Sequence, residues 1–159
     1  MDKKIVDRML NPSLMRFFYT KSLPGALFFG LKVSALDDQH AIVEVPYRWS
    51  TKNPFQSIYF AALAAASELS TGCIAMAAVE GKNISMLVTN MEGSFSKKAK
   101  ERIYFECNEV KKVLDGVHEA ETTGNGVVIR LNTIGKTKDG SEVARFVYEW
   151  SLKKKTKKN

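Results

Sequence analysis

One carboxylate, Glu68, lies in the middle of a segment that carries no other charged side chain. Residues 53–79 read NPFQSIYFAALAAASELSTGCIAMAAV, so small and apolar residues surround Glu68 in the sequence. A charge in such surroundings is costly unless it is paired, hydrated or used in a reaction. A carboxylate whose pKa is tuned by its environment can act as a general base or as a nucleophile. Glu68 is therefore the first candidate for a catalytic residue.

The residues of other catalytic machineries are scarce. His40 falls in an alternating strand pattern and His118 in a polar connection, and the sequence has no further histidine. Cys73 and Cys107 are far apart, form no CxxC or zinc-ligand spacing, and are typical of small core residues. The sequence thus has few of the residues that a metal cluster or a Ser-His-Asp triad requires. We expect neither a metal nor a cofactor.

The segment around Glu68 has the composition of a buried helix. Alanine dominates it, followed by Leu, Ile and Met, which all favour helix. We expect Gln56 and Ser57 to open the helix after Pro54, and Gly81 to close it. Because the helix is apolar nearly all round, protein or lipid must surround it. Its length would suffice to cross a membrane, but the central Glu68 and the amphipathic strands that follow favour a helix enclosed by a sheet, without a membrane span.

Period-two patterns before and after this helix predict β-strands. Four strands are expected at residues 30–36, 40–46, 84–96 and 102–110. Residues 127–152 form a hairpin pattern that turns at Asp139-Gly140. Residues 111–124 are expected to be a polar connection that could include one helical turn. The order of elements is short helices, two strands, one long buried helix and four strands.

The N-terminal region predicts a short helix. Asn11 is a helix cap and Pro12 takes the first helical position, so we expect a helix to about Lys21, ended by residues 23–25. One face of it carries Leu10, Leu14, Phe17 and Phe18. We expect this face to pack on the body of the protein, with contact to a membrane as the alternative.

Composition and charge favour one globular domain. The chain has 159 residues, of which 45% are hydrophobic and 26% charged, values that argue against disorder. Five of the seven net positive charges are those of Lys153, Lys154, Lys155, Lys157 and Lys158. The remaining near-balance argues against nucleic-acid binding. We expect residues 1–152 to form a single domain and residues 153–159 a basic disordered tail. The N-terminus lacks the apolar run of a signal peptide, which favours the cytoplasm.

The predicted fold class is α+β. An apolar helix needs a sheet that curves about it, and about six mostly antiparallel strands can supply one. This is the arrangement of the hotdog fold, with the short N-terminal helices added.

Residues 53–68 resemble a motif of the hotdog thioesterases of the phenylacetate-pathway type, N-x-x-G-x-x-H-G-G-x-x-x-x-L-x-D/E. Asn53 takes the Asn position and Glu68 the position of the catalytic acid, with the spacing intact. The departures are Gln56 for the first Gly, Tyr59 for the His, Phe60-Ala61 for the Gly pair and Ala66 for the Leu. Together with Pro46-Tyr47-Arg48, the segment looks more like a largely uncharacterised bacterial branch of thioesterase-like domains.

The resemblance implies hydrolysis of an acyl-CoA or a carrier thioester. Glu68 would be the base or nucleophile, and Asn53 would orient the water or the carbonyl group. Backbone N–H groups near Phe60 and Ala61, at the helix N-terminus, would bind the oxyanion. The substrate-binding positions implied are Gln56, Ser57, Tyr59, Phe60 and Ala61.

Helix geometry suggests that one chain does not complete this site. Tyr59 and Glu68 are nine positions apart, which places them on opposite sides of a helix and about 13 Å apart along it. Two neighbouring helices from two subunits could bring them together. This fits the dimer of the family that the motif resembles, in which two sheets join edge to edge. We expect a homodimer or a tetramer.

A non-catalytic module that binds an acyl-like apolar small molecule is the alternative function. Phe60 puts a ring where the motif has glycine, which lets the backbone approach a ligand closely, and a tyrosine such as Tyr59 is a poor proton shuttle at neutral pH. In this alternative a hydroxyl such as that of Ser57 or Ser70 from a partner helix satisfies Glu68 without turnover.

Overall fold

We describe the protein from a computed structural model, which covers residues 1–155 in detail. The helices are α1 (Lys3–Leu10), α2 (Pro12–Ser22), α3 (Pro24–Phe29), the 3-10 helix η1 (Trp49–Thr51), α4 (Phe60–Val79) and α5 (Val110–Thr123). The strands are β1 (Lys32–Leu36), β2 (Ala41–Val45), β3 (Ile84–Phe95), β4 (Ile103–Cys107), β5 (Val127–Lys136) and β6 (Glu142–Lys154).

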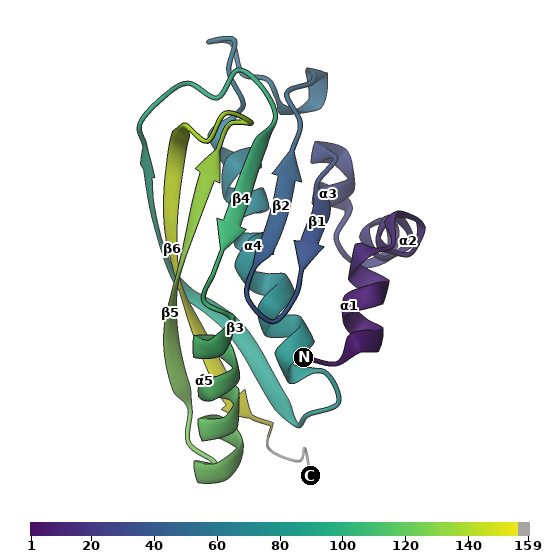
Figure 1. The fold of residues 1–159 in the computed structure, drawn as a ribbon, viewed down its shortest axis with the longest axis vertical. Helices are drawn as coiled ribbons and strands as arrows, with labels where there is room; N and C mark the ends of the chain where they lie inside the picture. Colours follow the sequence, from purple (N-terminus) through teal and green to yellow (C-terminus); the bar gives the residue numbers. More distant parts are fainter. Residues whose placement is uncertain (156–159) are drawn as a thin grey trace.

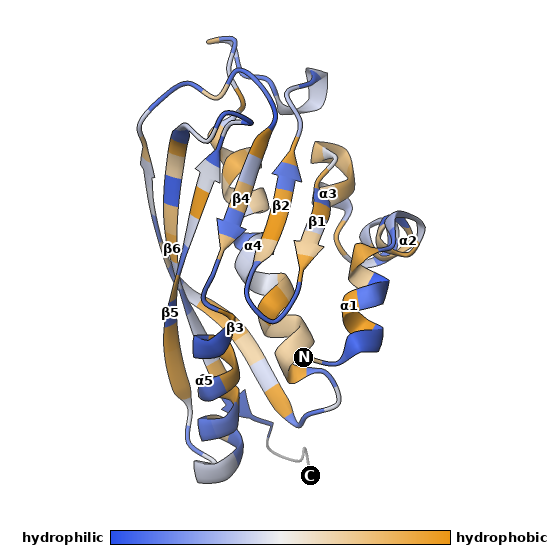
Figure 2. Ribbon diagram, in the orientation of Figure 1, coloured by the Kyte–Doolittle hydropathy of each residue, from blue (hydrophilic) through white to orange (hydrophobic). Residues whose placement is uncertain are grey.

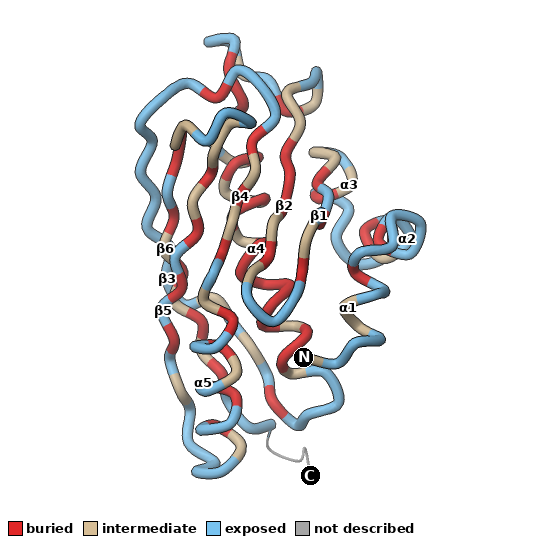
Figure 3. The backbone as a smooth tube through the Cα atoms, viewed as in Figure 1, coloured by how far each residue is buried: buried red, intermediate tan, exposed pale blue. Residues whose placement is uncertain are grey.

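The six strands form one antiparallel sheet in the order β1-β2-β4-β5-β6-β3. The sheet curves around α4, as Figure 1 shows. Hydrophobic and hydrophilic residues alternate along β4 (Figure 2), and buried and partly buried residues alternate along the same strand (Figure 3). Its residues Ile103, Phe105 and Cys107 belong to the common buried core. This is the hotdog arrangement predicted from the sequence.

The central helix begins later than predicted. α4 starts at Phe60, whereas Gln56 and Ser57, which we expected to open it, belong to the preceding loop. Gln56 has a φ of 58°, in the left-handed region, so it cannot continue a right-handed helix. α4 has the length and hydropathy of a membrane span, but 72% of its apolar window is buried inside the protein, as in a core helix.

Three α-helices were not placed by the sequence analysis. α1 precedes the predicted N-terminal helix, and the side chain of its N-cap residue Asp2 accepts a hydrogen bond from the backbone N–H of Lys4. α3 begins at Pro24, where we expected only a chain break, because proline suits the first turn of a helix. α5 takes the place of the predicted polar connection. Its buried residues Val110, Val113 and Val117 recur at helical spacing and pack against the sheet.

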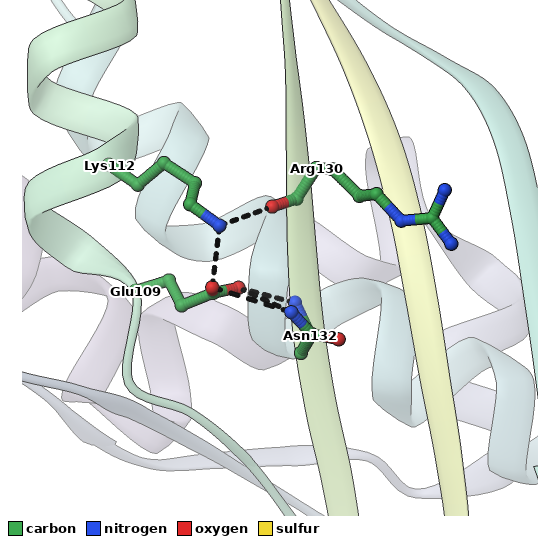
Figure 4. A network of polar contacts seen from close by, with 4 residues as sticks. All are labelled: Glu109, Lys112, Arg130 and Asn132. Carbon is green, nitrogen blue, oxygen red and sulfur yellow. Dashed lines mark hydrogen bonds and ion pairs between the residues drawn. The ribbon is translucent and has the colours of Figure 1, made fainter.

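Polar contacts at the start of α5 fix it to β5 (Figure 4). The Lys112 ammonium donates to the Glu109 carboxylate at 2.7 Å and to the backbone carbonyl of Arg130 at 2.8 Å. The same carboxylate accepts hydrogen bonds from the backbone and side-chain N–H groups of Asn132. These contacts hold the N-terminus of the helix over the strand.

The three N-terminal helices stand beside β1, at one edge of the sheet (Figure 1). Met9, Met15 and Tyr19 are their buried contacts with the body of the protein. The predicted apolar face is therefore partly wrong, since Leu14 is 49% and Phe17 71% exposed. The helices are rotated so that a neighbouring set of side chains faces inward.

The C-terminal strand extends further than predicted. Lys153 and Lys154 belong to β6 and pair with Ser85 and Ile84, and the backbone N–H of Lys155 donates to the carbonyl of Asn83 at 2.9 Å. The expectation of a disordered tail is thus wrong for residues 153–155, because backbone pairing needs no apolar side chain. Residues 156–159 lie outside the described part of the chain.

Candidate functional site

Hydroxyl side chains on the buried side of α4 are bonded to the sheet. The pairs are Ser67 with Tyr148 at 2.7 Å, Ser70 with Thr133 at 2.7 Å, and Thr71 with Trp150 at 3.0 Å. Burial raises the pKa of Tyr148 to about 12, so this hydroxyl stays protonated and also donates to the backbone carbonyl of Ala64 at 3.0 Å. The polar groups on this side of the helix are thus satisfied within the chain.

Glu68 lies on the side of α4 that the sheet leaves open. The partly exposed residues of the helix recur at helical spacing and are Ala61, Ala64, Ala65, Glu68, Met76 and Val79. Burial raises the pKa of the Glu68 carboxyl above its ordinary range, and no hydrogen bond within residues 1–155 offsets this effect. The hydroxyls of Ser57 and Ser70 are committed to other partners in their own chain. Glu68 is a partly buried carboxylate that the chain itself does not neutralise.

Gly72 makes room for the Glu68 carboxylate one turn further along the helix. A Cβ at position 72 would lie 3.2 Å from Glu68 Oε1 and 3.5 Å from the ring of Trp150. The carboxylate therefore folds back over Gly72, next to the edge of the indole. The sequence analysis missed both residues. A usable signal was the glycine itself, since glycine costs about 1 kcal/mol relative to alanine inside a helix.

An exposed apolar surface lies on the neighbouring edge strand β3. Met91 pairs with Tyr148 and Phe95 with Ala144, so their side chains share the sheet face that α4 covers. Met91 is 48% and Phe95 51% exposed. The sequence analysis also missed these residues, because their position depends on the register of β3 against β6.

The loop before α4 is organised by Asn53. Its side-chain Oδ1 accepts hydrogen bonds from the backbone N–H groups of Phe55 at 3.0 Å and Ser57 at 3.1 Å, and from the Ser57 hydroxyl at 3.2 Å. Gln56 occupies the position of the first glycine in the motif, and its positive φ preserves the backbone conformation that glycine would adopt there. The Tyr47 hydroxyl donates to the Gln56 carbonyl at 3.1 Å.

The N-terminus of α4 presents free backbone donors. Tyr59 is the N-cap residue, and its side chain makes no capping hydrogen bond. The N–H groups of Ala62 and Leu63 donate to the Tyr59 carbonyl, whereas those of Phe60 and Ala61 meet no acceptor among residues 1–155. The rings of Tyr59 and Phe60 are exposed and lie 4.9 Å apart, centre to centre, in a T-shaped contact.

The predicted site residues therefore form two groups within one chain. Asn53, Gln56 and Ser57 lie together in one loop, next to the helix start at residues 59–61. Glu68 lies eight positions beyond Phe60, or about 12 Å along the helix axis at 1.5 Å per residue. A single copy of the chain does not bring Glu68 to the free N–H groups.

Comparison with known proteins gives a family and a fold. The sequence model of the family described as "Domain of unknown function (DUF4442)" matches residues 14–152. The curated proteins contain no match.

Solved structures share the fold at low sequence identity. A protein of unknown function from Pseudomonas aeruginosa, described as a probable thioesterase, is 19% identical with a TM-score of 0.74, over 93% of this chain and 99% of that one. A protein of unknown function from Chlorobaculum tepidum is 16% identical with a TM-score of 0.75, over 92% and 99%. A thioesterase from Haemophilus influenzae is 10% identical with a TM-score of 0.67, over 89% and 90%. These likenesses show that the chain shares the hotdog fold of these proteins.

Proposed function

We propose that this chain, which belongs to the DUF4442 family, hydrolyses an acyl thioester, with Glu68 as the reactive carboxylate and a second copy of the chain completing the site. The observation that supports the proposal most directly is the environment of the Glu68 carboxylate. This carboxylate is partly buried, has a raised pKa and no hydrogen-bond partner within residues 1–155, and occupies the open side of α4. A carboxylate held at such a cost is typical of a functional site. The thioesterases among proteins of similar fold add support at the level of the reaction class.

As a general base, Glu68 takes a proton from water while the water oxygen bonds to the carbonyl carbon of the thioester. The carbonyl oxygen becomes an oxyanion, which the N–H groups of Phe60 and Ala61 from the other copy stabilise. The C–S bond then breaks, the acyl group leaves as a carboxylic acid, and the thiolate takes the proton from Glu68. As a nucleophile, Glu68 would instead form an acyl anhydride that water hydrolyses.

The second copy of the chain is proposed because it can bridge the separation along α4. β3 is an edge strand of 12 residues that pairs on one side with β6, and edge strands of this length need a cover. Two copies joined along this edge would cover Met91 and Phe95 and bring the N-terminus of one α4 near the Glu68 of the other. A homodimer is the smallest assembly that provides this arrangement.

The loop residues receive supporting roles in this proposal. Asn53 uses its side-chain oxygen inside the loop, so we assign it to holding the loop and the helix start in place. Gln56 and Ser57 belong to the same loop wall. Tyr59, Phe60 and Ala61 line the approach of the acyl group to the helix N-terminus.

Binding without turnover is the alternative, and one observation favours it. Phe60 is 57% exposed and packs edge-on against Tyr59, at the position where the motif has glycine. Aromatic rings there would hold an apolar acyl-like group, yet they would narrow the access of a thioester carbonyl to the N–H groups.

Release of free thiol from a panel of acyl-CoA substrates of different chain length tests the proposal. Wild type should release thiol, and Glu68→Gln should not. Glu119→Gln, a change of the same chemistry on the exposed side of α5, is the control and should keep wild-type rates. Unchanged hydrolysis by Glu68→Gln would reject the role of Glu68. Thermal stabilisation by acyl-CoA without any thiol release would favour the binding module.

Sedimentation tests the two-copy site separately. A species of twice the chain mass of 17.8 kDa, or a multiple of it, is expected at micromolar concentration. A monomer alone under assay conditions would remove the shared site.

A further inference from the structure

A cavity of about 470 Å³ lies between the N-terminal helices and β1, and no residue of α4 lines it. Its volume falls within the range of small-molecule sites. The apolar part of its wall comes from Met9, Met15, Leu27, Leu31 and Val33. The cavity thus shares no lining residue with α4, which carries Glu68. The N-terminal helices and β1, which supply most of its lining, are seen side by side in Figure 1.

The charged side chains that line this cavity are all cations. Arg16, Lys32 and Arg48 reach it, and no carboxylate is among its lining residues. Lys32 lies 3.9 Å from the Glu44 carboxylate, but Arg102 pairs with that carboxylate more closely, at 2.6 Å. Within residues 1–155 neither Arg16 nor Arg48 has a carboxylate within 4 Å. The cavity therefore combines an apolar wall with uncompensated positive charge.

Arg48 is held in place by neutral groups. Its Nη2 donates to the backbone carbonyls of Phe28 at 2.6 Å and Leu27 at 3.3 Å, and its Nε donates to the Ser50 hydroxyl at 2.9 Å. Gly30 has a φ of 68°, and a Cβ there would lie 2.5 Å from the guanidinium carbon. The absence of a side chain at position 30 lets the guanidinium lie against the backbone. Its orientation is fixed while its charge is not neutralised.

We infer that this cavity binds an amphipathic anion, with a hydrocarbon chain against the apolar wall and a carboxylate or phosphate head near Arg16 and Arg48. A planar guanidinium matches both kinds of head group, and a hydrocarbon chain gains from leaving water. A free fatty acid and a lipid phosphate share this chemistry. The inference does not rest on the proposed hydrolysis, because the cavity and Glu68 share no residue.

Methyl NMR can locate the binding event. The full chain, labelled at the methionine methyl groups, is titrated with dodecanoate below its micelle concentration. Met9 and Met15 line the cavity, but they also line a smaller pocket against α4 that includes Met76, so an unshifted Met76 distinguishes the cavity from that pocket. Met91 lies on β3 beside the surface proposed for hydrolysis. We expect saturable shifts of Met9 and Met15. Shifts confined to Met91 would place the ligand at the other site and overturn the inference, as would no shift at all.

Variants test the charge and the cavity independently. Arg16→Gln should weaken dodecanoate binding about five- to tenfold, the effect of one favourable charged contact. Lys21→Gln removes the same kind of charge from the same helix outside the cavity and should change affinity less than about twofold. Leu10→Trp, at the rim of the cavity, should fill it and abolish the shifts of Met9 and Met15. Folding of each variant is verified by circular dichroism. If all three variants bind dodecanoate with the affinity of the wild type, the inference is overturned.

Head-group probes distinguish the sources. Dodecanol should bind at least fivefold more weakly than dodecanoate, and equal affinity would overturn the role of the cations. If dodecyl phosphate binds more tightly than dodecanoate, the natural ligand is a lipid phosphate, and the reverse order points to a free fatty acid. Either order supports an amphipathic anion.

Discussion

The indole N–H of Trp150 donates to the hydroxyl of Thr71 at 3.0 Å, and this hydroxyl in turn donates to the backbone carbonyl of Glu68 at 2.9 Å. Thr71 therefore links β6 to Glu68, whose carboxylate is the reactive group in the proposed function. The contact between Trp150 and Thr71 is buried.

Thr71→Val should remove this link and destabilise the protein by about 1–3 kcal/mol, because the buried N–H of Trp150 loses its acceptor. Urea unfolding measures the change. Thr20→Val is the control, since the Thr20 hydroxyl bonds only to the carbonyl of Arg16 in an exposed helix, and it should change stability by less than about 0.5 kcal/mol. An equally small effect of Thr71→Val would mean that the link carries little energy.

Glu68→Gln should stabilise the protein at neutral and alkaline pH. Burial raises the pKa of Glu68 in the folded state, so the folded state holds its proton more tightly than the unfolded state. The wild type then loses stability as the pH rises from the ordinary glutamate pKa through the raised folded value. Glutamine does not titrate, so thermal unfolding of the two proteins should converge near pH 4 and separate above it. A variant that is less stable at pH 8 would indicate that the carboxylate has a stabilising partner.

Gln56→Gly should leave stability unchanged or raise it by up to about 1 kcal/mol. Glycine adopts the positive φ of position 56 without strain, although it gains more entropy in the unfolded chain. Gln56→Val should lower stability by more than about 1 kcal/mol, because a β-branched residue is poorly tolerated in the left-handed region. Chemical denaturation of the pair measures both. Equal effects of the two changes would contradict the assigned conformation.

Tyr19→Phe should stabilise the protein by about 1 kcal/mol. The Tyr19 hydroxyl is buried and has no hydrogen-bond partner in the described part of the chain, so its removal ends the cost of burying an unpaired polar group. Tyr148→Phe is the opposite case, because its hydroxyl contacts Ser67 and the Ala64 carbonyl, and it should destabilise by about 1–2 kcal/mol. Urea unfolding measures the change in the free energy of unfolding for both variants. Changes of the same sign would contradict the contrast between the unpaired Tyr19 hydroxyl and the paired Tyr148 hydroxyl.

Truncation should separate two parts of the C-terminus. Removal of residues 153–159 deletes the pairing of Lys153 and Lys154 with β3, so the melting temperature should fall by several degrees. Removal of residues 156–159 spares that pairing, and we expect no change. Differential scanning calorimetry of the two truncated chains tests this, and a matching loss in both would show that residues 156–159 matter.

The central helix and the hairpin could be predicted from the sequence because their signals are local. The composition of residues 60–79 favours a buried helix in any fold, and Asp139-Gly140 specifies a turn. The predicted start of α4 was wrong. Gln56 and Ser57 are compatible with a helix, but the hydrogen bonds that the Asn53 side chain accepts stabilise a turn at these residues instead. The charged side of α5 concealed the spacing of its buried valines.

Part of the candidate site could be predicted in the same way. Glu68 is conspicuous by its charge, and its motif neighbours lie close to it in sequence. Trp150 and Met91 reach the site through strand pairing, and a register shift of one residue would turn both side chains to the other face of the sheet. Such long-range placement cannot be inferred from spacing along the chain.

The three hydroxyl contacts of α4 with the sheet also determine which way the helix faces. A helix that is apolar nearly all round gains about as much from burial at one rotation about its axis as at another, so hydrophobic packing alone does not select a direction for Glu68. A turn of one residue, about 100°, would separate Ser67, Ser70 and Thr71 from their partners on β5 and β6 at once. These three small polar residues therefore set the rotation of α4 about its axis. The direction of the Glu68 carboxylate is specified by side chains that have no role in the reaction proposed for it.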